Sequence, residues 1–237
     1  MIVIGIETST PQTSVAIGTE DTILAEATVA GKARQEAVTP VLDHLLQWAG
    51  LDLQEVEGVA VGLGPGLFTG LRVGVETAKT LAQVLDVPIL GVGSLDVLAA
   101  PVRAARRTIA AVIDGRRGEV FWAAYRSLSS GVQRMREPSV CTPNRLVEGL
   151  GTISGELVIV GNGAVLYREE ISALGAKVEL ASPMLGHPRA AHVIELAAPL
   201  LAAGDRDDLF EITPSYLRRS DAEIAWDRRA QGLSSTD

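Results

Sequence analysis

The residues nearest the N-terminus whose types could do chemistry are Glu7, Thr8 and Ser9, directly after an apolar segment at residues 2–6. A carboxylate and two hydroxyls at the end of a strand can face a metal-bound phosphate, since Mg²⁺ prefers oxygen ligands. The following connection, TSTPQTS, has no glycine and places Pro11 where a backbone donor would be useful. Two interpretations stay open: the hydroxyls cap the turn locally, or they contact a phosphate.

A second candidate is the glycine-rich loop GPGLFTG, between a buried apolar stretch and a helical pattern. Such a loop can present backbone amides and a helix dipole to an anion, and the candidate contacts are Gly64, Gly66 and Thr69. The spacing of its glycines matches neither a Walker A loop nor the dinucleotide fingerprint. An anion site and a tight turn that binds nothing are equally compatible with the pattern.

A third candidate is the segment from Asp114 to Glu119, which carries both signs of charge and two glycines. It lies where a second phosphate loop would lie. A charged turn between two strands explains the same residues, because glycines flanking polar residues suit a hairpin.

Metal binding and nucleophilic catalysis find no support in the sequence. His44, His187 and His192 are not spaced as a ligand pair, and Cys141 has no base near it in the sequence. We therefore expect no catalytic residues, no metal and no cofactor.

The charge and composition restrict the partners that the chain can bind. Of 237 residues 47% are hydrophobic and 4% aromatic, and the net charge is −8. An acidic chain is poorly suited to hold nucleic acid by itself, because that affinity comes from Lys and Arg on phosphates. One cysteine, no visible export signal and no long apolar run predict a cytoplasmic protein outside the membrane.

The periodicity predicts an α/β fold in two domains, residues 1–106 and 107–237. The expected elements of the first are strands at 2–6, 15–17, 23–29, 59–63 and 89–92 and helices at 38–49, 71–85 and 95–105. A restart of the strand-turn-strand pattern at 108–126 marks the second domain. Its later elements are strands at 157–160 and near 178 and a helix at 190–203, before a polar tail.

Two helices of the first domain carry a pattern that a partner could use. One has an apolar face, and the other repeats small side chains every four residues, which lets backbones approach closely. These residues are Val38, Val41, Leu42 and Leu45 on the first helix, and Gly70, Gly74, Ala78 and Ala82 on the second. Packing on the chain's own sheet and an intermolecular helix bundle are both compatible with this pattern.

Several motifs together resemble the TsaB family, also called YeaZ. They are IGIETST, GLGPGLFTGLRVGVETAKTLA, DGRRGEVFWAAY, GNGAVLY and SYLRRSDA, which are spread over nearly the whole chain. The resemblance implies a two-domain actin-like fold (the sugar kinase, Hsp70 and actin type). It also implies a non-catalytic partner of the catalytic subunit TsaD and the ATPase TsaE. Their complex adds a threonylcarbamoyl group to adenosine beside the anticodon of tRNAs that read ANN codons.

The resemblance assigns roles to residues already named. It implies partner contact through Val38, Val41, Leu42, Leu45, Gly70, Gly74 and Ala78, with tRNA reached only through the complex. Both a homodimer and a monomer stay open for the chain alone. Glu7 stands where many members have Asp, and Leu67 replaces a frequent Ser, so Glu7, Thr8, Ser9, Gly64, Gly66 and Thr69 would form at most a vestigial nucleotide or phosphate contact. TsaD relatives carry two metal-binding histidines on the helix where this chain has only His44. The alternative is a stand-alone ATP-dependent kinase or carbamoyl-type transferase.

Overall fold

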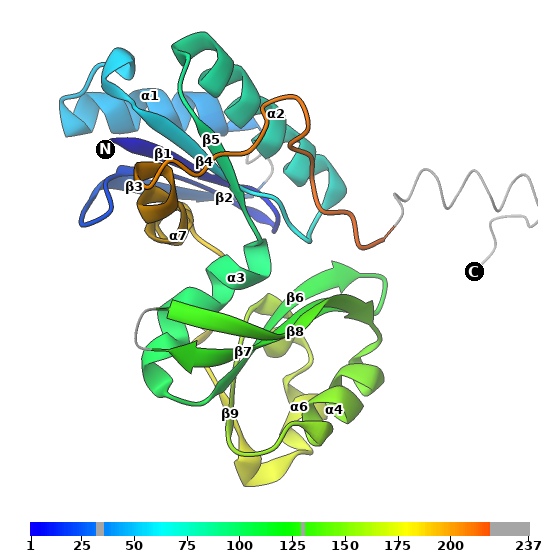
Figure 1. Ribbon diagram of the computed structural model, residues 1–237. Helices are drawn as coiled ribbons and strands as arrows, with labels where there is room; N and C mark the ends of the chain where they lie inside the picture. The colour runs from blue at the N-terminus through cyan, green and yellow to red at the C-terminus, as the bar shows by residue number, and fades with distance from the viewer. Residues whose placement is uncertain (32–35, 129–130, 219–237) are drawn as a thin grey trace, which may run out of the picture.

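Two five-stranded sheets, one above the other, organise the chain in the computed structural model (Figure 1). The structure describes residues 1–31, 36–128 and 131–218. The first sheet has the order β3-β2-β1-β4-β5. Its strands are β1 (Val3–Glu7), β2 (Gln12–Gly18), β3 (Ile23–Ala30), β4 (Gly58–Gly62) and β5 (Ile89–Val92).

The second sheet repeats the topology of the first, with the order β10-β9-β6-β7-β8. Its strands are β6 (Thr108–Arg116), β7 (Glu119–Leu128), β8 (Gly131–Cys141), β9 (Leu157–Val160) and β10 (Val178–Leu180). In each sheet three antiparallel strands come first, and two strands parallel to the opening strand follow. The strand-turn-strand restart predicted from the sequence is therefore confirmed.

Helices cover both faces of each sheet. The α-helices are α1 (Val38–Ala49), α2 (Phe68–Leu85), α3 (Ser94–Ala99), α4 (Pro143–Thr152), α5 (Asn162–Leu166), α6 (Arg168–Ser172) and α7 (Ala190–Ala202). Short 3-10 turns lie at η2 (Leu53–Glu55), η3 (Ala100–Ala105), η4 (Gly175–Lys177) and η5 (Pro183–Leu185). Helices α1 and α2 pack on one face of the first sheet, and α4, α5 and α6 pack on one face of the second.

The remaining two helices are exchanged between the halves of the chain. Helix α3 follows the first sheet in the sequence, yet its Leu95 and Leu98 pack with Ile109 of the second sheet. Helix α7 follows the second sheet, yet its Val193 packs with Val3 of the first. In Figure 1, α7 accordingly lies against the first sheet and α3 sits between the two. Each sheet therefore buries one of its faces with a helix from the other half of the sequence.

The exchange bears on the expected division into residues 1–106 and 107–237. We propose two lobes, one around each sheet, with α7 belonging to the first lobe and α3 to the second by packing. None of the helices in the described part of the chain combines the length and apolar character that a bilayer crossing requires.

Candidate functional site

Glu7, the last residue of β1, points into the protein interior. Its side chain is 1% exposed, and its carboxylate accepts hydrogen bonds from the Ser9 amide (2.7 Å) and the Ser94 hydroxyl (2.9 Å). A Cβ atom at Gly62 of β4 would overlap this carboxylate, so the glycine provides the space that it occupies. Burial raises the pKa of the Glu7 carboxyl, and these hydrogen bonds offset part of that rise. Glu7 thus joins β1 to the start of α3 and faces away from solvent.

Thr8 and Ser9 are also engaged within the chain. The Thr8 hydroxyl donates to the Gly70 carbonyl (2.8 Å), and the Ser9 carbonyl accepts from the Leu67 amide (2.7 Å). Both residues are buried. A Cβ at Gly70 would overlap the Thr8 carbonyl, and one at Gly66 would overlap that of Ser9. The glycine loop and the start of α2 therefore rest directly on the β1–β2 connection.

Two amides of the glycine loop, those of Gly64 and Leu67, are used by this packing. The Gly64 amide donates to the Ser94 hydroxyl (3.1 Å), and the Gly64 carbonyl accepts from the Ser94 amide (2.8 Å). Of the six residues predicted for phosphate contact, Thr69 is the one that the structure exposes. The other five lie close together, and the hydrogen bonds of Glu7, Thr8, Ser9 and Gly64 go to groups of the same chain.

The turn between β6 and β7 holds the third candidate. Asp114 is buried, and its carboxylate accepts from the Arg116 amide (2.9 Å), while its own amide donates to the Asn162 side chain (3.0 Å). Arg116 and Arg117 both adopt positive φ, 64° and 55°. The segment is the charged hairpin turn that the glycines favoured, tied to the start of α5.

The structure places most of the predicted partner-contact residues inside the chain's own core. Val38, Leu42, Leu45, Gly70, Gly74 and Ala78 are buried, and of the seven only Val41 is partly exposed. A Cβ at Gly74 would overlap the Thr8 hydroxyl, so the small-residue strip accommodates the β1–β2 connection. The apolar face of α1 packs toward the first sheet and α2. That α1 and α2 meet a partner stays a prediction, and the side chains of Val38, Leu42, Leu45 and Ala78 are already packed within the chain.

Other residues on the same two helices are exposed and could contact a partner. The sequence pattern did not identify them. Trp48 of α1 is 73% exposed and Val84 of α2 is 74% exposed. His44 packs edge-on against Trp48, with ring centroids 6.0 Å apart. An apolar residue on the polar side of an amphipathic helix is the signal that could have identified both.

A segment after α7, residues 205–218, runs along β5 and α2 and is called here the C-terminal strap (orange in Figure 1). The Asp207 amide donates to the Ile89 carbonyl (2.9 Å), and the Ser215 amide donates to the Leu63 carbonyl (2.7 Å). Tyr216 stacks on Phe68 at 4.8 Å between centroids. The strap thus covers the outer edge of the first sheet.

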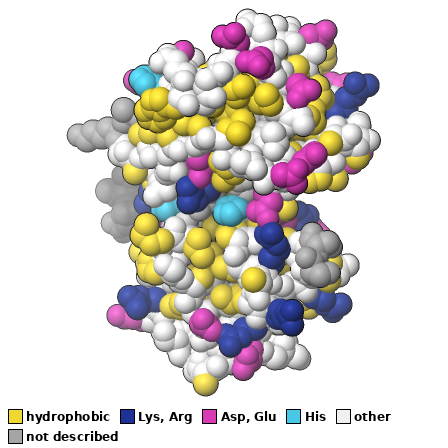
Figure 2. Space-filling view, turned by 90° about the vertical axis from the view of Figure 1, so that its left-hand side faces the viewer, with side chains coloured by type: hydrophobic (Ala, Val, Ile, Leu, Met, Phe, Trp, Pro, Cys, Tyr) yellow, Lys and Arg dark blue, Asp and Glu magenta, His cyan; other side chains and the backbone are white. Residues whose placement is uncertain are grey.

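The two lobes are joined by ion pairs as well as by the exchanged helices. Arg218, at the end of the strap, pairs with Glu119 of the second sheet (2.7 Å), and Arg103 of η3 pairs with Glu195 of α7 (2.5 Å). His192 also contacts Glu195, at 2.9 Å. Figure 2 shows histidine and charged side chains gathered at the waist between the lobes. Among the described residues no three His, Cys, Asp or Glu side chains are grouped to hold a metal ion.

These features define the class of protein. It is a two-lobed actin-like α/β protein in which the loops that would grip a phosphate are packed against each other. The family model described as "TsaD: tRNA N6-adenosine threonylcarbamoyltransferase" matches residues 25–226. YeaZ from Pseudomonas aeruginosa has a similar structure, with a TM-score of 0.78 and 26% identity over 91% of this chain and 99% of that one.

Curated relatives specify the family further. The tRNA threonylcarbamoyladenosine biosynthesis protein TsaB of Escherichia coli is 30% identical over 230 residues, 95% of this chain and 97% of the relative. The Bacillus subtilis protein of the same name is 30% identical over 228 residues, 95% and 98% of the two chains. The chain belongs to the TsaB family, also called YeaZ, of tRNA threonylcarbamoyladenosine biosynthesis proteins.

Proposed function

We propose that this chain is a non-catalytic partner subunit in the cytoplasmic complex that transfers a threonylcarbamoyl group to adenosine beside the anticodon of tRNAs reading ANN codons. In this proposal it stabilises and positions the catalytic subunit TsaD, with the ATPase TsaE, and tRNA is reached only through the complex. The observation that carries the proposal is the burial and hydrogen bonding of the Glu7 carboxylate. Its carboxylate is 1% exposed and hydrogen-bonded to Ser9 and Ser94, so it does not face a cleft where a metal-bound nucleotide could react.

The proposed contact with TsaD is made by the outward faces of α1 and α2. Trp48 and Val84 are large apolar side chains exposed to solvent. Tryptophan is enriched among the residues that dominate binding energy at protein interfaces. Loss of such an anchor costs about 2 kcal/mol or more, which is roughly a 30-fold loss of affinity. In the free protein the same face would pair with a second copy of the chain.

The test is reconstitution of tRNA modification with purified cognate TsaD and TsaE, with and without this chain. We expect modification to require the chain, and Trp48→Glu or Val84→Glu to weaken TsaD binding by at least tenfold in calorimetry. Leu166→Glu is the matched control, since Leu166 is 58% exposed on α5 of the other lobe. Glycine-strip variants such as Gly74→Leu are unsuitable, because they would disturb the fold itself.

Two outcomes would count against the proposal. Full modification activity without the chain would remove any need for a partner subunit. Steady ATP hydrolysis by the isolated chain would favour the stand-alone kinase or transferase instead.

A further inference from the structure

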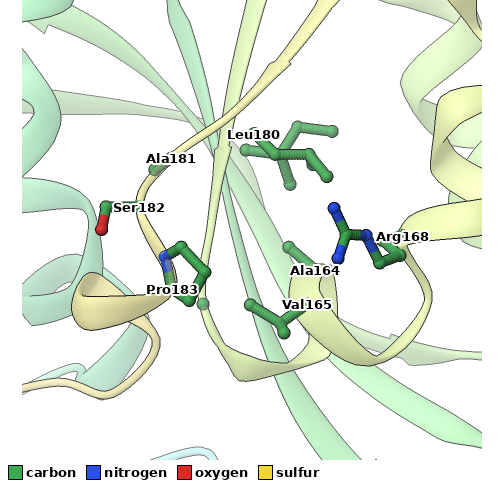
Figure 3. Close-up of a pocket in the computed structure, with 9 residues that line it drawn as sticks. Ala164, Val165, Arg168, Leu180, Ala181, Ser182 and Pro183 are labelled. Carbon is green, nitrogen blue, oxygen red and sulfur yellow. The ribbon is translucent and has the colours of Figure 1, made fainter.

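The second lobe contains a cavity at the carboxyl ends of the parallel strands β9 and β10, and nothing in the proposed function uses it (Figure 3). Its volume is about 180 Å³. Ile159 and Leu180 come from the strands, Ala164 and Val165 from α5, and Pro183 from η5. The walls are therefore mainly apolar.

The equivalent position in the first lobe is closed. There the chain leaving β4 and β5 is joined by the hydrogen bonds from Leu63 to Val92 (2.8 Å) and between Gly64 and Ser94. In the second lobe the Ala181 amide bonds to the Ile159 carbonyl (2.9 Å), and beyond it the segments after β9 and β10 diverge around the cavity. Ligands of α/β proteins typically bind at this end of parallel strands.

Arg168 gives the cavity a positive charge. Figure 3 shows its guanidinium extending from α6 toward Leu180 and Ala164, whereas the Ser182 hydroxyl is turned away. Arg168 is exposed, and no carboxylate among the described residues forms an ion pair with its guanidinium, which is also true of Arg126. A guanidinium beside an apolar wall favours a planar anion such as a carboxylate or a phosphate group.

We infer that this cavity binds a small ligand with a flat aromatic ring and one anionic group, the ring between Val165 and Leu180 and the anion on Arg168. A volume near 180 Å³ equals that of roughly six waters, below the range of about 300–1,000 Å³ of sites for drug-sized molecules. One ring system fits inside, and a longer substituent must extend past Arg168. Aromatic carboxylates and nucleoside monophosphates share this chemistry.

The test uses the isolated, isotope-labelled chain and two probes, indole-3-carboxylate and AMP. We expect saturable amide shifts limited to residues 161–168 and 180–183 with at least one probe, and the responding probe identifies the source of the anion. The neutral counterparts, indole and adenosine, should bind at least fivefold more weakly. Because no partner protein is present, the result does not depend on the proposed subunit role.

Variants separate the charge from the cavity. Arg168→Gln should weaken the responding probe at least fivefold, and Val165→Phe, which fills the cavity, should abolish its shifts. Arg126→Gln is the matched control, an exposed arginine at the opposite end of the same sheet, and it should bind as the native chain does. The inference would be overturned by an absence of shifts at millimolar probe, by shifts elsewhere in the chain, or by unchanged binding in Arg168→Gln. If Val165→Phe fails to fold, Arg168→Gln still tests the inference.

Discussion

At the scale of single residues, a few buried polar groups hold the glycine loop and the β1–β2 connection of the first lobe together. Glu7 receives a backbone amide and a hydroxyl, and the Ser94 hydroxyl in turn receives the Gly64 amide, so one carboxyl group links β1, α3 and the glycine loop. Burial raises the pKa of Glu7 because the charged form loses its hydration. Glu7, which the sequence offered as a candidate contact for a metal-bound phosphate, is in this structure a connector inside the fold.

A pH titration of stability tests this role. The folded-state pKa of Glu7 lies above its ordinary value of 4.5. Its stabilising contribution is therefore complete below that value and is lost as the pH rises through the folded-state pKa. Glu7→Gln cannot ionise, so its free energy of unfolding relative to that of the native chain should rise as the pH passes through the folded-state pKa of Glu7, as measured by urea denaturation. Parallel pH profiles would contradict this expectation.

Glu7→Ala provides the control for the hydrogen bonds themselves. It leaves the Ser9 amide and the Ser94 hydroxyl without their acceptor and opens a space beside Gly62. We expect a loss of about 2 kcal/mol or more at low pH, where Glu7 is protonated, since unsatisfied buried donors and cavities both destabilise. The loss should become smaller as the pH rises through the folded-state pKa of Glu7, because Ala cannot ionise either.

At the scale of elements, α2 is held on its outer side by the C-terminal strap. Arg72 lies over the Phe68 ring at 4.0 Å and donates to the Tyr216 hydroxyl at 3.1 Å, and the Lys79 ammonium donates to the Ile212 carbonyl at 3.3 Å. Ile212 is buried in the same core as the apolar face of α1. The strap therefore fixes the helix whose exposed residues are proposed to meet TsaD.

Removal of one ring should detach this contact without unfolding the chain. Tyr216→Ala loses the stacking on Phe68 and the hydrogen bond from Arg72, so we expect about 1–2 kcal/mol less stability. Hydrogen exchange should accelerate at the Ser215 amide, which bonds to Leu63. Phe210→Ala is the control, because Phe210 is 80% exposed and should change stability by less than about 0.5 kcal/mol. Equal effects of both variants would refute an anchoring role for Tyr216.

The helices and strands show how much of the secondary structure could be predicted from the sequence. The strands of the first sheet and helices α1, α2 and α7 follow from periodicity, because β1, β2, β4 and the three helices each bury apolar residues, whereas β3 is only partly buried. Strand β8 was not predicted, since its residues Arg134, Met135 and Arg136 are exposed and break the alternation of an edge strand. Periodicity identifies the buried face of α1, but it cannot tell whether a sheet or another protein covers that face.

At the scale of the whole molecule, the two lobes depend on each other through the exchanged helices. On the face of the first sheet opposite α1 and α2, the apolar cluster includes Val193, Ile194 and Ala197 of α7. On the second sheet, Leu95 and Leu98 of α3 fill the corresponding place. A sheet with one uncovered apolar face is not stable in water. Neither half of the sequence can therefore complete its own core.

This dependence predicts how fragments behave. Residues 1–106 and 107–237, produced separately, should lack the amide dispersion of a folded protein in NMR spectra, because each sheet lacks one covering helix. Residues 1–94 joined by a flexible linker to residues 188–218 keep Ser94, the partner of Glu7 and Gly64, and regain α7 and the strap, so this chimera should fold as the first lobe. Substitution of Val193 and Ile194 by Asp in the chimera should abolish folding, since both side chains are fully buried against the sheet. A well-dispersed spectrum from residues 1–106 alone would show that the first sheet does not need the helix that the second half supplies.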